Sequence, residues 1–380
     1  MKILILSTYP PRKCGIATFT WNLTKHLRKN LSLSRLGIIA INDSHTQEIH
    51  SYGEDVVWVM DQSKISSYSQ TAEFVNQSDY PFLHIQHEFG IYGGRENYSI
   101  FELVENLTRP FLVTFHSVPP EPEEWERRIL EKIHKLSSFT IVQSRKAVEI
   151  LESKYGGERE KIVYIPHGVP RPPLEKREEW RRKWGWEEKF VLLTFGLLNP
   201  RKGLEDLIRA TSMLYQEFPQ IFTVILGRPH PRFFYFQGRP LTQYLLDLAE
   251  EKGVRDRVYI PGTYLSEDDL LSALVACDVV ITPYRRVARG QIVSGVLSYA
   301  LGCGKAVVST PYLHAEELLS GGAGLLVEFD NPESLAQGIR ILLKNPEELL
   351  KMEKKARELG ENFYWDVVAR RYGEVYRWVK

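Results

Sequence analysis

The stretch that decides the fold reads Asp278-Val-Val-Ile-Thr-Pro-Tyr-Arg-Arg-Val-Ala-Arg-Gly-Gln-Ile-Val-Ser-Gly-Val-Leu-Ser-Tyr-Ala-Leu-Gly-Cys-Gly-Lys-Ala-Val-Val-Ser-Thr-Pro-Tyr312. Its two short apolar runs, Val279–Ile281 and Ala306–Ser309, are typical of buried parallel strands. The residues between them, Ile292–Leu301, have the length and spacing of a crossover helix. The stretch therefore predicts a strand, a helix and a second strand of one parallel sheet.

The pair Ser294-Gly295 falls where this helix is predicted to begin. A helix start offers unpaired N–H groups and the positive end of the macrodipole, and a glycine lets a ligand approach the backbone. One interpretation is an anion site; the other is a plain strand–helix–strand unit whose glycine serves packing. On this stretch alone the packing interpretation is favoured.

The composition limits the classes of function. At 380 residues the chain exceeds one ordinary core and fits two domains. A hydrophobic content of 43% and a charged content of 26% are normal for a globular protein. The net charge of +1 gives no global field that would favour a nucleic acid or a membrane surface.

Cysteine usage and hydropathy bear on the compartment. Cys14, Cys277 and Cys303 form no close pair, which argues against a disulfide framework or a thiolate zinc site and suits a reducing environment. The opening apolar run, Met1–Leu6, is too short for a signal peptide, and no stretch is long enough to span a bilayer. We therefore expect a cytoplasmic protein.

Predicted strands and helices alternate twice, on either side of a proline-rich segment. Pro166–Pro173 holds four prolines in eight residues and is the natural linker. The alternation predicts doubly wound, Rossmann-like α/β domains over residues 1–168 and 174–362. Near the linker, Glu175–Lys189 carries three tryptophans with balanced charges, so we expect a solvated helix that buries them more than a membrane-facing one.

The two halves share a basic loop before their first helix. The loops read Pro11-Arg12-Lys13-Cys14-Gly15 and Pro200-Arg201-Lys202-Gly203. Cations at a helix N-terminus oppose the macrodipole, and a bound anion would reverse that penalty. The duplication favours a phosphate-bearing ligand at the carboxyl ends of the sheets over ordinary exposed basic loops.

In order and spacing, these pieces resemble a group-1 retaining glycosyltransferase of the GT-B type. The resemblance covers nearly the whole chain and rests on Pro10–Phe19, Gln86–Gly94, Thr114–Ser117, Ile165–Val169, Phe195–Leu204, Ile225–Pro231, Asp278–Tyr284 and Ser294–Pro311. It implies two Rossmann-like domains facing a central cleft. It also implies that the C-terminal helix in residues 364–380 crosses back to the first domain.

The resemblance implies transfer of a hexose from a sugar nucleotide to a hydroxyl acceptor on a sugar or glycan. The anomeric configuration would be retained, and neither a metal nor another cofactor would be needed. The donor would lie against the second domain and the carbohydrate acceptor against the first.

Several residues match family positions. Lys202 matches the lysine that neutralises the leaving diphosphate, with Arg201 assisting. Gly15 matches the glycine loop over the donor phosphates. His116 matches the histidine near the transferred sugar, although its spacing alone indicates only a histidine at a strand end. The phosphate-holding helix start corresponds to the backbone amides of Ser294, Gly295 and Val296.

Other positions are open or depart from the family pattern. Tyr264 lies where the family holds the nucleobase, where it would stack on a base or only fill a surface groove. The two glutamates that commonly flank the helix start are Gln291 and Tyr299 here, and the usual arginine after the strand glycine is Leu197. Tyrosine offers one hydroxyl where a glutamate offers the ribose two acceptor oxygens. These changes weaken the expectation of nucleotide binding more than that of phosphate binding.

Two acidic features remain. His87-Glu88 follows a predicted strand and could orient an acceptor hydroxyl or replace the charge lost at Gln291; the alternative is a structural loop with a buried Glu–His pair. We favour the functional interpretation, because charged groups rarely stand at sheet ends without a partner. The triplet Glu267-Asp268-Asp269 follows Ser266, so helix capping explains it better than a metal site.

Two alternative functions stay open. A glycoside phosphorylase of the same fold would use phosphate and a sugar 1-phosphate, and Gln291 and Tyr299 keep it in play. A weakened sugar or nucleotide binder is the other, against which His116, Arg201 and Lys202 argue. We expect no nucleic-acid partner and no membrane span, and the sequence gives no support for peripheral membrane contact.

Overall fold

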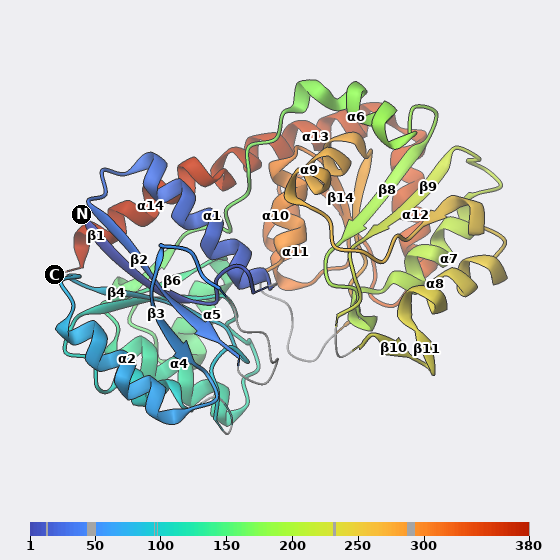
Figure 1. The fold of residues 1–380 in the computed structure, drawn as a ribbon. Coiled ribbons are helices and arrows are strands. Elements are labelled where there is room, and N and C mark those ends of the chain that lie inside the picture. The colour runs from blue at the N-terminus through green and yellow to red at the C-terminus, as the bar shows by residue number, and fades with distance from the viewer. Residues whose placement is uncertain are drawn as a thin grey trace. The chain divides into compact units, whose positions relative to one another are not determined.

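The computed structural model describes residues 1–12, 14–43, 51–94, 96, 98–230, 233–286 and 293–379 (Figure 1). The chain divides into two compact units. Unit 1 comprises Met1–Gly168 and Trp365–Lys380, and unit 2 comprises Val169–Tyr364.

Unit 1 is built on a parallel sheet whose described strands run in the order β3-β2-β1-β4-β5-β6-β7. The order reverses between β1 and β4, because the chain first winds outward through β2 and β3 and then crosses back. The strands are β1 (Lys2–Ser7), β2 (Arg35–Asn42), β3 (Val56–Asp61), β4 (Leu83–His87), β5 (Phe111–Phe115), β6 (Phe139–Val142) and β7 (Ile162–Tyr164).

Helices cover both faces of this sheet, as right-handed crossovers require. The helices α1 and α14 pack side by side on one face, and α2, α4 and α5 lie on the other (Figure 1). The helices of unit 1 are α1 (Gly15–Asn30), α2 (Ile65–Gln77), α3 (Ile100–Val104), α4 (Glu124–Leu136), α5 (Arg145–Tyr155) and α14 (Trp365–Trp378).

The C-terminal helix α14 is part of the unit 1 core. Its residues Trp365, Val368, Tyr372 and Tyr376 are buried against the sheet and α1. Gly168 makes room for the first of them, since a Cβ there would lie 2.2 Å from Cε3 of the Trp365 ring. The return of the C-terminal helix to the first domain is therefore confirmed.

Unit 2 repeats the architecture with described strands in the order β12-β9-β8-β13-β14-β15, all parallel. The order reverses between β8 and β13. The strands are β8 (Phe190–Phe195), β9 (Ile221–Leu226), β12 (Val258–Tyr259), β13 (Val279–Thr282), β14 (Ala306–Ser309) and β15 (Gly324–Leu326), beside a small antiparallel hairpin of β10 (Tyr235–Phe236) and β11 (Arg239–Pro240).

The helices of unit 2 also cover both faces. On one face, a core of buried aliphatic side chains joins the sheet to α7, α8 and α12. The helices α9, α10 and α11 belong to connections that run in the opposite direction along the sheet, so right-handed crossovers place them on the other face. The helices are α6 (Arg177–Trp184), α7 (Leu204–Leu214), α8 (Leu241–Glu251), α9 (Glu267–Ala276), α10 (Gly295–Gly302), α11 (Leu313–Leu319), α12 (Pro332–Lys344) and α13 (Pro346–Gly360).

The two strands and the helix predicted within Asp278–Tyr312 are present in the described residues. Val279–Thr282 and Ala306–Ser309 pair in parallel, and the helix Gly295–Gly302 connects them. The helix begins after Ser294, later than the predicted Ile292, which lies outside the described residues.

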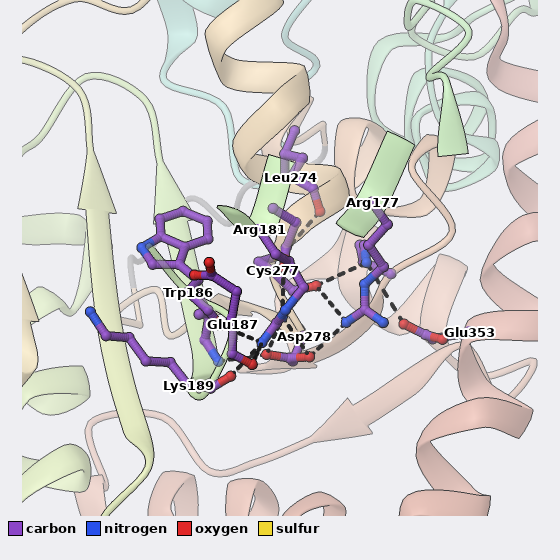
Figure 2. A network of polar contacts seen from close by, with 12 residues as sticks. Arg177, Arg181, Trp186, Glu187, Lys189, Leu274, Cys277, Asp278 and Glu353 are labelled. Atoms are coloured by element: carbon purple, nitrogen blue, oxygen red, sulfur yellow. Dashed lines mark hydrogen bonds and ion pairs between the residues drawn. The ribbon is translucent and has the colours of Figure 1, made fainter. Parts of the chain in front are cut away.

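The tryptophan-rich segment before β8 also behaves as expected. Trp186 is 2% exposed, and the ring of Trp184 stacks on it at 5.2 Å. The segment is anchored by Arg181, whose guanidinium donates to the carbonyls of Ala276 and Lys189 (Figure 2). This helix therefore packs on unit 2 instead of presenting its tryptophans to a membrane.

Candidate functional site

The strand orders show where each unit is expected to bind a ligand. In doubly wound sheets ligands bind beyond the carboxyl ends of the strands, where the strand order reverses. In unit 2 this point lies between β8 and β13, and in unit 1 it lies between β1 and β4. The predicted site residues Lys202 and Glu88 come from segments that follow β8 and β4.

Lys202 bends back across the end of the unit 2 sheet. Its Nζ donates to the carbonyl oxygen of Phe195 at 3.1 Å and to the hydroxyl of Tyr284 at 3.2 Å. Phe195 ends β8 and Tyr284 follows β13, so the amine sits at the reversal point. Gly196 leaves the space open, because a Cβ there would lie 3.3 Å from Nζ.

The ammonium group of Lys202 has no counter-charge among the residues that the structure describes. Among the described residues, no carboxylate lies within ion-pair distance of it. Burial lowers the pKa of Lys202 to about 8. A buried cation without a carboxylate is costly, and a ligand anion would offset that cost.

The start of α10 leaves two backbone amides unused within the described chain. Ser294 caps the helix with its hydroxyl, which accepts from the N–H of Leu297, and its own N–H donates to Nδ1 of His314 at 2.9 Å. Within the described chain, this leaves the N–H groups of Gly295 and Val296 without a partner. Of the three amides predicted from the sequence, Ser294 is thus occupied inside the protein.

The helix start and the lysine converge. A Cβ on Gly196 would lie 3.3 Å from Nζ of Lys202 and 3.9 Å from Cγ2 of Val296. The Lys202 ammonium group and the side chain of Val296, in the first turn of α10, therefore both lie next to Gly196 at the end of β8. This combination suits a phosphate group.

Arg201 is placed differently from its neighbour. It lies in the 3-10 turn Pro200–Lys202, which Asn199 caps by accepting from the Arg201 N–H at 3.0 Å. The Arg201 residue is exposed. Arg201 thus differs from Lys202, whose ammonium group bonds to Phe195 and Tyr284.

A carboxylate stands beside Tyr299. The Tyr299 hydroxyl donates to Oε1 of Glu267 at 3.0 Å, although the two residues are 32 positions apart. Tyr299 is one helical turn beyond Gly295, on the same side of α10. Burial and the Glu267 charge raise the pKa of Tyr299 well above its ordinary value. Tyr264 is 61% exposed.

In unit 1, β4 and β5 bring His116 and Glu88 to neighbouring strand ends. The backbone N–H of His116 donates to the backbone carbonyl of His87 at 2.9 Å, which extends the β4–β5 ladder. The Glu88 carboxylate accepts from the Ser117 hydroxyl and from the Phe89 N–H, both at 2.8 Å. Burial raises the pKa of Glu88 to about 7, against the opposing effect of these two bonds.

His116 is a buried, neutral histidine. It is 9% exposed, and its ring meets the edge of the Phe19 ring at 4.8 Å. Burial lowers the pKa of His116 well below its ordinary value. The side chain therefore offers one hydrogen-bond donor and one acceptor near neutral pH.

His87 has surroundings of another kind. Its ring stacks on Tyr92 at 5.6 Å and meets the edges of Phe89 and Phe115. The side chain is fully buried, and in the described structure neither ring nitrogen has a hydrogen-bond partner. Burial lowers the pKa of His87 to about 3. Its surroundings are those of a packed core residue.

The first basic loop is only partly described. Gly15 begins α1, and a Cβ there would meet no atom within 4 Å, so the backbone is accessible. Arg12 donates to the carbonyl of Ile41 and to Oε1 of Gln62, so its charge serves unit 1 itself. Lys13 and the predicted site residue Gln291 lie outside the described residues.

Two further observations concern the rest of the described chain. In the part of the chain that is described, no three His, Cys, Asp or Glu side chains gather as metal ligands. A groove of about 800 Å³ lies in unit 1 near Phe111, at the amino end of β5, and is lined also by Phe101, Arg128 and Lys132. His116 follows the other end of that strand, so this groove is not the predicted site.

Some site features were not found from the sequence. Gly196 directly follows β8 and Tyr284 lies two residues beyond β13, and this closeness to a strand end is the signal that could have identified them. Glu267 was interpreted only as a helix-capping residue. Its contact with Tyr299 has no local signal, because α9 and α10 are brought together by the sheet.

Comparison with known proteins agrees with this architecture. Residues 14–171 match the family model described as Glycosyltransferase Family 4, and residues 176–359 match the one described as Glycosyl transferases group 1. The structure of HepE from Anabaena in complex with UDP aligns with a TM-score of 0.77 and 18% identity, covering 99% of this chain and 100% of that chain. Sucrose-phosphate synthase from Thermosynechococcus elongatus also gives 0.77 and 18%, covering 99% and 98%.

Curated relatives cover less of the chain. The D-inositol 3-phosphate glycosyltransferase of Kineococcus radiotolerans is 28% identical over 269 residues, or 66% of this chain and 59% of that protein. The GDP-mannose-dependent alpha-(1-6)-phosphatidylinositol monomannoside mannosyltransferase of Mycobacterium tuberculosis is 26% identical over 230 residues, or 58% of this chain and 57% of that protein. The chain thus spans less than two thirds of the length of these relatives.

Two doubly wound, parallel-sheet units with these neighbours define an α/β protein of the GT-B fold. The chain belongs to the group 1 glycosyltransferases. The resemblance inferred from the sequence is confirmed, as is the fold class. None of the described helices is both long and apolar enough to cross a membrane.

Proposed function

We propose that the protein transfers a hexose from a sugar nucleotide to a hydroxyl acceptor, with retained anomeric configuration. The observation that carries this proposal is the buried ammonium group of Lys202, which lacks a carboxylate partner among the described residues and faces the start of α10. When the bond between the sugar and the diphosphate breaks, negative charge grows on the diphosphate. Lys202 and the amides of Gly295 and Val296 would stabilise that charge.

The nucleoside part of the donor needs its own contacts. We propose that the Glu267 carboxylate, oriented by the Tyr299 hydroxyl, accepts from the ribose hydroxyls. It would restore the carboxylate that the family holds at the position of Tyr299. The exposed ring of Tyr264 would stack on the base. A carboxylate and an aromatic ring beside a phosphate site favour a nucleotide over phosphate alone, and hence the transferase over the phosphorylase.

In unit 1, the proposed sugar-binding groups are His116 and Glu88. Their strand ends are adjacent, so both could bind hydroxyls of one sugar. Glu88 and the neutral His116 would orient hydroxyl groups and would not form a hydrolytic acid/base pair. We assign His87 a structural role, because three aromatic rings enclose it.

The remaining expectations are part of the same proposal. The transfer would use no metal and no other cofactor, since the charge of the leaving diphosphate is met by Lys202 and the helix start. The acceptor would be a carbohydrate, and we propose a cytoplasmic location. The Anabaena HepE structures are complexes with UDP and with UDP-glucose, which supports a sugar-nucleotide donor here.

The test compares how ligands stabilise the protein. A ligand that binds only the folded state raises the unfolding free energy by about 2.7 kcal/mol at a hundredfold excess over its Kd. We expect one nucleoside diphosphate to raise the melting temperature well above the shift given by inorganic phosphate. Equal shifts from phosphate and from all nucleoside diphosphates would favour the phosphorylase.

Variants assign the nucleoside contacts. Glu267→Gln should reduce the nucleotide shift and leave the phosphate shift unchanged. Asp268→Asn, an exposed neighbour on the same helix, is the matched control and should change neither. Turnover is then measured as nucleoside diphosphate released from sugar nucleotides with carbohydrate acceptors. Tight nucleotide binding with no turnover for any donor would favour the weakened binder.

A further inference from the structure

A chain of buried polar side chains runs through unit 1 from α14 to His116. The Nε2 atom of His116 lies 2.8 Å from Oε1 of Gln86, and Nε2 of Gln86 lies 3.0 Å from Nε2 of His84. The Nδ1 atom of His84 lies 2.9 Å from the hydroxyl of Tyr376. Apart from Tyr376 at 2% and His116 at 9%, these side chains are fully buried.

We propose that Gln86 is a positioning residue that holds His116 in the tautomer with Nε2 protonated, which turns Nδ1 into the acceptor for a substrate hydroxyl. The inference rests on the proposed function for its substrate, a sugar. Gln86 and His116 both belong to unit 1, so the effect of Gln86 on the imidazole does not depend on which substrate is bound.

The two ends of the Gln86 amide have opposite hydrogen-bonding roles. The amide nitrogen of Gln86 can only donate, so the ring nitrogen of His84 that it meets must accept. The amide oxygen can only accept, so Nε2 of His116 must donate to it. A neutral imidazole carries a single ring N–H, which leaves a lone pair on Nδ1 of His116.

The far end of the chain is compatible with this orientation of the amide. With His84 Nε2 accepting from Gln86, Nδ1 of His84 carries the proton and donates to the Tyr376 hydroxyl. Thr114 adds a hydroxyl 2.9 Å from His84 Nε2 and 3.3 Å from the hydroxyl of Tyr372. Two tyrosines of α14 thus support the glutamine, so the C-terminal helix contributes to the orientation of His116.

The surroundings of His116 favour a neutral ring held by a neutral partner. The imidazoles facing it are His84 and His87 of β4 and His167 after β7, and burial lowers the pKa of all three. The ring of Phe19 faces it from α1. In the described residues no carboxylate lies within ion-pair distance of His116, so the amide of Gln86 is the group that selects the tautomer.

The first test is nitrogen NMR of the full-length protein with labelled histidine, which reports which ring nitrogen carries the proton. The His116 signal is assigned by its loss in His116→Ala. We expect a protonated Nε2 and an unprotonated Nδ1 in the wild type. In Gln86→Leu we expect exchange between the two tautomers.

Two further variants complete the design. Gln86→Glu keeps the shape and supplies a carboxylate, so it should raise the pKa of His116 by about one unit or more and remains informative if Gln86→Leu does not fold. Tyr92→Phe removes the hydrogen bond to the backbone carbonyl of Gln86 but leaves the Gln86 side chain unchanged. This matched control should keep the wild-type tautomer.

Activity gives the second readout. Gln86→Leu should lower kcat about tenfold, with nucleotide affinity unchanged, because only the group facing the sugar is disturbed. A His116 that is protonated on Nδ1 in the wild type, or that keeps its tautomer in Gln86→Leu, would overturn the assignment. Absence of hexosyl transfer by the wild type would count against the proposed function, while the NMR result would still decide the role of Gln86.

Discussion

Arg181 and Asp278 form an ion pair inside unit 2, with Nη1 3.1 Å from Oδ2 (Figure 2). The side chains are only 8% and 12% exposed. Asp278 also accepts from Arg177 at 2.7 Å and from the N–H of Val191 at 2.7 Å. One carboxylate therefore joins α6 to β8 and to the start of β13, at the end of the strand opposite to the one that Tyr284 follows.

The first prediction concerns this pair. Asp278→Ala should lower the unfolding free energy by about 3–5 kcal/mol, because it leaves the Arg181 guanidinium buried without its charge partner. The measurement is urea unfolding. Lys183→Ala is the control, on the helix α6 that also carries Arg181. It breaks an exposed pair with Asp269 and should cost less than about 1 kcal/mol. Similar losses in both variants would contradict the special role of the buried pair.

The second prediction concerns catalysis at the lysine. Lys202→Met should lower turnover about a hundredfold, the usual scale for losing one electrostatic stabiliser of a developing charge. Steady-state kinetics with a sugar nucleotide measure the change. Lys189→Met, which removes a lysine that lies over the Phe222 ring, is the control and should leave turnover near normal. Near-normal turnover of Lys202→Met would remove this residue from the proposed site.

The same variant should be more stable than the wild type without ligand. Burial lowers the pKa of Lys202 from 10.5 to about 8. Between these values the unfolded chain holds a proton that the folded protein has lost, so wild-type stability rises with pH. The advantage of Lys202→Met should be largest below about pH 8 and should disappear near pH 10.5, as measured by thermal unfolding across that range.

The third prediction uses the carboxyl group of Glu88. Burial raises its pKa from 4.5 to about 7, so between these values the folded protein binds the extra proton and stability falls as pH rises. Glu88→Gln should therefore be more stable than the wild type above pH 7, with no difference below about pH 4.5. Melting temperatures at the two ends of this range test the sign. A wild type that gains stability relative to Glu88→Gln on going to alkaline pH would disprove the raised pKa.

The fourth prediction concerns the docking of α14. Gly168→Ala would place a Cβ 2.2 Å from Cε3 of the Trp365 ring, so the ring or the backbone must move. We expect a loss of about 1–3 kcal/mol or more in unfolding free energy, the usual cost of overpacking. Gly53→Ala is the control in unit 1, because a Cβ there meets no atom within 4 Å. A change in Trp fluorescence should accompany the loss only in Gly168→Ala.

The regular elements of this protein could largely be predicted from the sequence, but not all of them. Short apolar runs in the sequence indicate the buried strands, because both faces of a parallel sheet are covered. The helix α2 has a weak local signal, because its first turns are rich in serine, which competes for backbone hydrogen bonds. Burial of Tyr68, Ala72 and Val75 stabilises it instead, and that burial exists only in the folded unit.

The sequence by itself determined the fold class and the residue types at the strand ends: a lysine after β8, a serine–glycine helix start, and a histidine after β5. The partners of these residues were decided by the tertiary structure. Strand order brings Lys202 to Tyr284, His314 to the N–H of Ser294, and Glu267 to Tyr299. Local periodicity specifies an element, whereas hydrogen bonds between residues 20 to 82 positions apart depend on which strands and helices lie side by side.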